Sequence, residues 1–148
     1  MDMGNVAYIL RPKQDVSYIF DHITVRQALE RMRRDGFTEV PVISSDGKYV
    51  GTVSEGDFLW FILDSGLMGN ELVGLLKNTK VSALVRKNRN PSAKITSPME
   101  DLLQQSINQN FIPILDDRDV FIGIVVRGDI IKYFTQKREE KKETSSVS

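Results

Sequence analysis

The stretch EVPVISSDGKYVGTVSEGDFLWF at residues 39–61 returns, in altered form, as FIPILDDRDVFIGIVVRGDIIKY at residues 111–133. The two stretches are 72 positions apart throughout, and the hydrophobic residues between the matched positions stay in phase. The special residues that match are Pro41 with Pro113, Gly51 with Gly123, Gly56 with Gly128, and Asp57 with Asp129. Because self-similarity at a fixed spacing is typical of a duplicated structural unit, we interpret the chain as two copies of one unit.

The first copy predicts a helix, two strands and a second helix. Residues 24–36 carry hydrophobic side chains at helical spacing, with Thr24 as the expected N-cap and Gly36 as the expected C-terminal stop. The elements predicted after this helix are two short strands joined by the turn SSDG and then a further helix, at 40–43, 49–53 and about 55–64.

The second copy predicts the same succession of elements. They are a helix near 98–108, strands at 111–115 and 120–126, and a helix from about 127 to 137. A short extended piece precedes the first helix of each copy, at 15–19 and 93–96. Each half therefore has the order β-α-β-β-α, and so small a sheet is not stable by itself. We predict an α/β (α+β) fold in which the two halves pack sheet to sheet with pseudo-two-fold symmetry.

The repeat divides the chain into four expected parts. Residues 1–65 form the first repeat with an N-terminal lead-in, and residues 91–137 form the second. The linker at 66–90 has leucines at helical spacing, which predicts a helix followed by a short helical turn near 81–85. Residues 138–148 have mixed charges and end in TSSVS, which is typical of a disordered tail.

Composition excludes several classes of protein. The 148 residues include 20 basic and 20 acidic side chains, so no net charge attracts the chain to a nucleic acid or an anionic membrane. No hydrophobic run approaches the length of roughly 18–20 residues that a membrane-spanning helix needs. The sequence has no cysteine, which rules out disulfides and thiolate metal sites. We predict a soluble, cytoplasmic protein that does not partner a nucleic acid or a membrane.

Motifs that carry catalysis are not found. The sequence has no GxxxxGK[ST], no GxGxxG and no HExxH, and its single histidine, His22, has no partners at catalytic or metal-ligand spacing. The acidic pair Asp116–Asp117 falls in a predicted turn, where solvated turn chemistry explains it. We therefore predict neither catalytic residues nor a metal site, and no enzymatic activity.

The two matched acids invite different explanations. Ser54 and Asp57 have the spacing of a helix N-cap and its reciprocal partner. In the second copy Asp129 persists, but Val126 replaces the serine and cannot cap a helix. An acid in the first turn of a helix is mildly favourable by about 0.3–1 kcal/mol through the helix dipole. Capping therefore explains Ser54 better than it explains Asp129, for which a ligand contact is the alternative.

The chain resembles a pair of CBS domains, the β-α-β-β-α modules that occur in tandem as a Bateman module. The resemblance covers roughly residues 13–137 and includes no further catalytic domain. Its marks are the hydrophobic-Pro-hydrophobic strand starts at 40–42 and 112–114, the acid-rich turns, the two matched glycines, and the Ser54-x-x-Asp57 element with its partner ending at Asp129.

The resemblance implies two clefts between the halves that bind adenosine derivatives such as AMP, ADP, ATP, S-adenosylmethionine or cyclic di-AMP. One cleft would combine Ser54, Asp57, Lys94, Ile95, Phe111, Ile112 and Pro113. The other would combine Val16, Ser17, Tyr18, Thr38, Val40, Pro41, Arg127 and Asp129. A carboxylate suits the two hydroxyls of a ribose, and the amides at a helix start suit a phosphate.

The two implied clefts differ in chemistry. Arg127 would offer a guanidinium group to a phosphate, whereas the matching residue in the first repeat is Glu55, which would repel one. Small CBS proteins that recognise cyclic di-AMP tend to have a basic residue before the first-strand valine and an Arg-Arg pair at the second element. This chain has Asp15 and Arg127-Gly128 at those positions, which weakens cyclic di-AMP as the specific ligand.

The hydrophobic helices that carry Trp60 and Tyr133 predict a homodimer in which these faces meet. Taken together, the resemblance implies a module that needs no cofactor, senses an adenine nucleotide and signals to an effector protein. The alternatives are a cyclic di-AMP receptor, a structural or scaffolding dimer with unoccupied clefts and, from another class, a minor nucleotide-processing enzyme.

Overall fold

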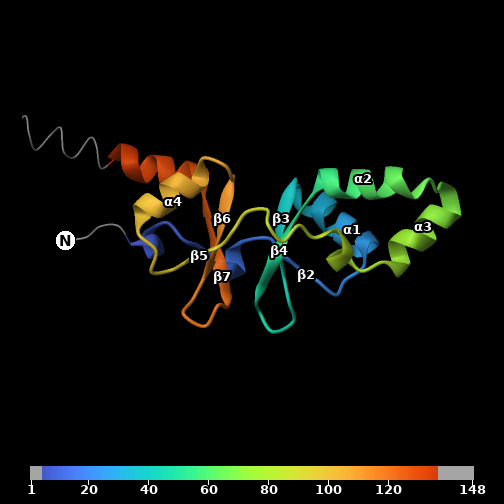
Figure 1. Ribbon diagram of the computed structural model, residues 1–148, viewed down its shortest axis with the longest axis horizontal. Coiled ribbons are helices and arrows are strands. Elements are labelled where there is room, and N and C mark those ends of the chain that lie inside the picture. The colour runs from blue at the N-terminus through green and yellow to red at the C-terminus, as the bar shows by residue number, and fades with distance from the viewer. Residues whose placement is uncertain (1–4, 137–148) are drawn as a thin grey trace, which may run out of the picture.

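Two small sheets stand side by side at the centre of the molecule, with helices at both ends (Figure 1). The structure is a computed structural model that describes residues 5–136. The first four residues of the predicted N-terminal lead-in, the last residue of the predicted second repeat and the predicted tail at 138–148 lie outside the described residues. The mixed α/β architecture and the packing of two repeats sheet to sheet are confirmed.

The first repeat follows its prediction closely. Its elements are β2 (Ile19–Phe20), α1 (Val25–Asp35), β3 (Glu39–Ile43), β4 (Tyr49–Ser54) and α2 (Glu55–Ser65), and the sheet order is β2-β3-β4. Thr24 caps α1 in a capping box with Gln27, and Gly36 ends it in the left-handed conformation with φ of 73°. The extended piece predicted at 15–19 is a strand only at its end, because Lys13–Asp15 forms a 3-10 turn.

The second repeat has the same order, with one strand more in its sheet. Its elements are β5 (Ala93–Lys94), α4 (Met99–Ser106), β6 (Phe111–Leu115), β7 (Phe121–Val126) and a helix over 127–136. The sheet order is β1-β7-β6-β5, in which β1 (Arg11–Pro12) runs antiparallel to β7. This N-terminal strand was not predicted.

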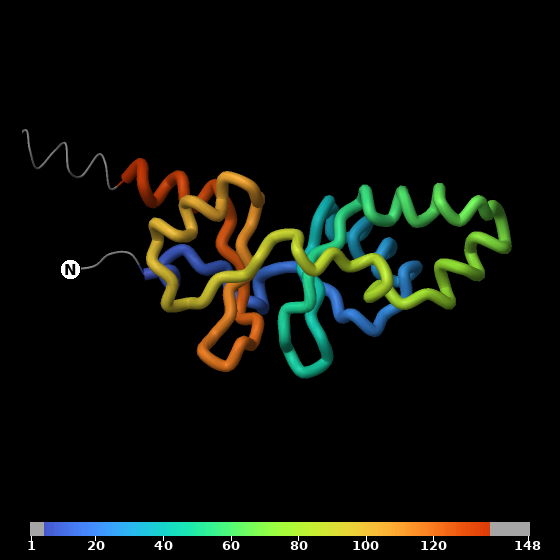
Figure 2. The backbone as a smooth tube through the Cα atoms, in the orientation of Figure 1, coloured from blue at the N-terminus to red at the C-terminus, as the bar shows by residue number. Residues whose placement is uncertain are grey.

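Each half is bordered by a segment that precedes the other half. Figure 2 shows the N-terminal segment lying along the second repeat before the chain crosses to the first. Val6, within a 3-10 turn at Val6–Tyr8, is fully buried in the core of the second repeat. In the first repeat the matching border is the end of the linker, where Arg86 bridges Thr52 of β4.

The two matched glycines let these border segments approach. A Cβ at Gly123 would lie 2.1 Å from the carbonyl oxygen of Arg11, and a Cβ at Gly51 would lie 2.8 Å from the carbonyl oxygen of Arg86. Real Cβ atoms do not come so close to a backbone oxygen. The glycines of the duplicated motif therefore leave room for the border segment that each half receives.

The linker and the contact between the halves complete the fold. As predicted, the linker is a helix, α3 (Gly69–Asn78), followed by a 3-10 turn at Val81–Leu84. The sheets meet through a hydrophobic cluster centred on Ile43, Leu115 and Phe121, and the hairpin tips join where the Phe121 N–H donates to the Gly47 carbonyl at 2.9 Å. Within residues 5–136, no helix combines the length and hydrophobicity needed to cross a membrane.

Candidate functional site

Asp57 sits on the third residue of α2 and is almost completely buried, with 7% of its surface exposed. Its Oδ2 accepts a hydrogen bond from the Ser54 backbone N–H at 2.8 Å, and the Ser54 hydroxyl lies 3.2 Å from the same oxygen. This is the reciprocal half of the predicted cap, so Asp57 has the structural role that its spacing suggested.

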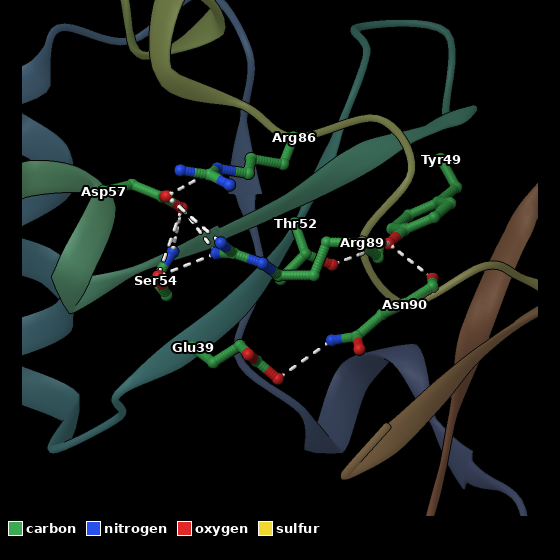
Figure 3. Close-up of polar contacts among 8 residues, drawn as sticks. All are labelled: Glu39, Tyr49, Thr52, Ser54, Asp57, Arg86, Arg89 and Asn90. Atoms are coloured by element: carbon green, nitrogen blue, oxygen red, sulfur yellow. Dashed lines mark hydrogen bonds and ion pairs between the residues drawn. The ribbon is translucent and has the colours of Figure 1, made fainter. Parts of the chain in front are cut away.

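Two arginines of the linker also bind Asp57 (Figure 3). Arg86 Nε lies 3.0 Å from Oδ1, while Arg89 places Nη1 2.6 Å from Oδ2 and Nη2 3.3 Å from Oδ1. Arg89 Nη1 also donates to the Ser54 hydroxyl at 2.7 Å. Such charge-assisted and forked contacts are the strong hydrogen bonds of proteins, so the carboxylate is firmly held.

Tyr49 anchors the backbone that carries these arginines. Its hydroxyl lies 2.6 Å from Thr52 Oγ1 and donates toward the carbonyl oxygens of Arg89, at 3.2 Å, and Asn90, at 2.9 Å. Asn90 is buried with a φ of 53°, and its side-chain amide donates to Glu39 Oε1 at 2.8 Å. The segment 86–90 is thus fixed at its side chains and at its backbone (Figure 3).

Burial raises the pKa of Tyr49 to about 12, although its hydrogen bond with Thr52 acts in the opposite direction. The native state therefore holds this proton more tightly than the unfolded chain, whose tyrosine titrates near 10. We expect the resulting stabilisation to be complete below about pH 10 and to be lost as the pH rises to 12, by up to about 3 kcal/mol. Urea unfolding at pH 8 and pH 12 measures it, and Tyr49→Phe should lose markedly less stability over this interval. Equal losses in both proteins would contradict the assignment.

Asp129 has a matching but more open environment. It forms one ion pair within the described residues, in which Arg11 Nε lies 3.1 Å from Oδ2. Of the two side chains, 54% of Arg11 and 24% of Asp129 are exposed. Arg11 and Arg86 occupy matching places. Arg11 pairs with Ile124, which follows Gly123, and Arg86 pairs with Thr52, which follows Gly51. Both acids therefore meet an arginine from the segment that precedes the other repeat.

A pocket of about 250 Å³ lies between the halves next to Arg11. Of the residues predicted for the second cleft, Val16, Ser17 and Pro41 line it. The remaining lining residues are Arg11, Asp15, Phe37, Glu39, Asn110, Phe111, Ile124 and Val126. The pocket therefore combines two aromatic rings and aliphatic walls with one cation and two acids.

The other residues predicted for this cleft lie elsewhere. Tyr18 packs its ring against Phe20 and Phe121, and Val40 is buried in the core of the first repeat. The Thr38 carbonyl accepts the Glu55 N–H at 2.9 Å. Arg127 Nε donates to the Ser106 carbonyl at 2.7 Å, at the end of α4. Asp129 reaches the pocket through its ion pair with Arg11.

The set predicted for the first cleft is brought together only in part. Ser54 and Asp57 are joined, as described above. The Lys94 amine instead pairs with Asp119 of the β6–β7 turn. Ile112 and Ile95 pack in the core of the second repeat, Pro113 is buried in β6, and Phe111 lines the pocket next to Arg11.

The sequence analysis did not predict several residues that line the pocket, nor the arginines that bind Asp57. Phe37 and Glu39 line the pocket because the strand starts of both repeats face each other, and the offset of 72 that pairs Glu39 with Phe111 was a usable signal. Arg86 and Arg89 bind Asp57 from a linker loop that shows no periodicity. Among residues 5–136, no three histidine or acidic side chains gather as metal ligands.

Comparisons with known proteins converge on one family. The CBS domain family model matches residues 6–64 and 81–136, which together are more than half of the chain. Over 120 residues, 81% of this chain, the sequence is 29% identical to an A-adding tRNA nucleotidyltransferase of Aquifex aeolicus (strain VF5), and it spans 13% of that enzyme's length.

Solved structures share the fold at lower identity. A crystal structure of CbpB in complex with c-di-AMP superposes with a TM-score of 0.80 at 23% identity, covering 95% of this chain and 90% of that one. A crystal structure of CBSX2 in complex with AMP gives a TM-score of 0.71 at 22% identity, covering 90% and 98%. These likenesses establish the two-repeat fold.

Proposed function

The chain belongs to the CBS domain family, and from that premise we propose that it is a regulatory module that binds an adenine nucleotide and signals the bound state to an effector protein. The observation that carries the proposal is the pocket of about 250 Å³ between the repeats, with the Arg11–Asp129 ion pair beside it. The structures of CbpB with c-di-AMP and CBSX2 with AMP support an adenine nucleotide as the ligand class.

The residues of the pocket suit the parts of a nucleotide. Phe37, which is 45% exposed, and Phe111 offer aromatic and apolar surface to a base. A phosphate would draw the guanidinium group of Arg11, and the ribose hydroxyls would then take its place at Asp129. The ligand therefore satisfies both members of an ion pair that is already half-exposed.

We expect nucleotides to stabilise the folded protein. A ligand that binds only the native state stabilises it by about 2.7 kcal/mol at 100 times its dissociation constant. A thermal-shift panel of AMP, ADP, ATP, NAD, S-adenosylmethionine and cyclic di-AMP should show a rise for at least one adenine nucleotide. No rise with any of them would remove the sensor proposal and favour a scaffolding dimer, and turnover in the same samples would favour an enzyme.

Asp129→Asn separates ligand contact from stability. The substitution keeps the size of the side chain and removes the charge that a ribose would use, so nucleotide affinity should fall by roughly tenfold or more. The half-exposed ion pair with Arg11 contributes about 1 kcal/mol or less, so the melting temperature of the ligand-free protein should barely change. Isothermal titration with wild type and variant measures the affinity. Unchanged affinity would exclude Asp129 as a contact.

We also propose that the protein is a homodimer that meets through its outer helices. On α2, Leu59, Trp60 and Leu63 are each more than half exposed, next to a groove of about 850 Å³ among α1, α2 and α3. Ile131, on the helix that also carries Tyr133, is 54% exposed. Such large exposed hydrophobic residues mark interaction surfaces. Analytical ultracentrifugation of wild type and Trp60→Glu tests the proposal, and a monomeric wild type would contradict it.

A further inference from the structure

We propose that the segment 86–90 blocks the first cleft, the one predicted at Ser54 and Asp57. Each chain then binds one nucleotide, in the cleft beside Arg11. Below, this segment in its blocking role is called the stopper. The inference rests on the proposed nucleotide binding and adds its stoichiometry. It also assigns to Arg89, which the family resemblance did not identify, the role of blocking the first cleft.

The first reason is the difference in occupancy between the two acids. Both oxygens of Asp57 are engaged, Oδ1 by Arg86 and Arg89 and Oδ2 by Arg89 and Ser54. A ribose would have to replace several charge-assisted hydrogen bonds in a buried place. At Asp129 it would replace one contact, and the Asp129 side chain is 24% exposed where that of Asp57 is 5% exposed.

The second reason is a difference between two matching positions, Gln109 and Phe37. Gln109 is buried, and its amide donates to the carbonyl oxygens of Pro91 and Phe111, each at 3.0 Å. Under the offset of 72, the residue that matches Gln109 is Phe37, which is 45% exposed and lines the open pocket. One matching position thus carries a buried amide that binds the backbone just after the segment 86–90, and the other carries an aromatic ring that lines the pocket.

The sequences of the two border segments differ at the position that would bind the acid. When Arg86 is laid over Arg11, an offset of 75, Arg89 falls on Gln14, and Gln14 is exposed. A glutamine cannot form the forked ion pair that Arg89 makes with Asp57. Arg89 is therefore the side chain that binds Asp57 and has no charged counterpart at the matching position of the other border segment.

The test is the number of nucleotides bound per chain, measured by equilibrium dialysis with radiolabelled ATP and AMP. Wild type should bind one. The double variant Arg89→Gln, Tyr49→Phe gives Asp57 the single-arginine environment of Asp129 and removes the hydroxyl that holds the segment, so it should bind two. Lys87→Gln is the matched control, because it removes a charge from the same segment without touching Asp57, and it should bind one. Two sites in wild type, or one in the double variant, would overturn the stopper.

A second measurement, hydrogen exchange, tests without any ligand whether the segment 86–90 is held in place. The Arg86 N–H donates to the Thr52 carbonyl at 3.1 Å, so its hydrogen exchange reports release of the segment. Exchange of this amide should rise roughly tenfold or more in the double variant and stay unchanged in Lys87→Gln. If neither protein binds a nucleotide, the proposed function fails, and the exchange result alone decides the stopper. Unchanged exchange in the double variant would overturn it.

Discussion

Asp57→Ala is expected to lower the free energy of unfolding by about 3 kcal/mol, which is about 10 °C in melting temperature for a chain of this size. The substitution leaves the Ser54 N–H without its acceptor, and it leaves Arg89, whose side chain is 26% exposed, without the carboxylate that it binds. Removing one partner of a largely buried ion pair is strongly destabilising, because the charge that remains stays partly desolvated. Urea unfolding followed by circular dichroism measures the loss.

The control is the same change in the other repeat. Asp129→Ala removes a single ion pair to an arginine that is 54% exposed, and we expect a loss of about 1 kcal/mol or less. The two matched acids should therefore separate, with Asp57 acting on stability and Asp129 acting on nucleotide affinity. Equal losses of stability in the two variants would show that the linker arginines do not hold Asp57 in solution.

Gly123→Ala is expected to destabilise the protein by a similar amount, about 3 kcal/mol. The added Cβ would lie 2.1 Å from the Arg11 carbonyl oxygen and 3.1 Å from a methyl group of Leu10. Either β1 separates from β7 or the strand shifts, and both uncover the buried Val6. Thermal unfolding gives the magnitude, and hydrogen exchange of residues 6–12 shows whether β1 has separated.

Gly74→Ala is the matched control for this experiment. Gly74 lies within α3, where an added Cβ would meet nothing within 4 Å. Alanine is the better helix former, so this variant should gain about 0.5–1 kcal/mol. A Gly123→Ala protein as stable as wild type would mean that β1 does not pair with β7 as described.

Local signals made much of the fold predictable. The cap at Thr24, the stop at Gly36 and the strand bounds at 111–115 depend on neighbouring residues, and the structure has them where the sequence indicated. The offset of 72 then placed the second repeat from the first. The pairing of β1 with β7 joins residues that are far apart in the sequence. A strand of two residues is too short to show a hydrophobic pattern, so this pairing could not be predicted.

The candidate site was predictable at the level of the backbone and less so at the level of side chains. Val16 and Ser17 lie just before β2 and Pro41 lies within β3, and all three line the pocket. Arg127 was expected to face a phosphate, but its Nε donates to the Ser106 carbonyl, an acceptor that becomes available only because α4 ends there. The linker arginines Arg86 and Arg89 are far from Asp57 in the sequence, and local sequence patterns do not predict contacts of that kind.

The exchange of border segments affects how this protein is made. Pro12 is synthesised before its partner, Gly123, and more than a hundred residues separate the two. While the first half is being synthesised, β1 therefore has no strand to pair with. A gene for one half alone would yield a chain that lacks its border strand. Such a chain could complete its sheet by taking that segment from a second copy of itself, in an intertwined dimer.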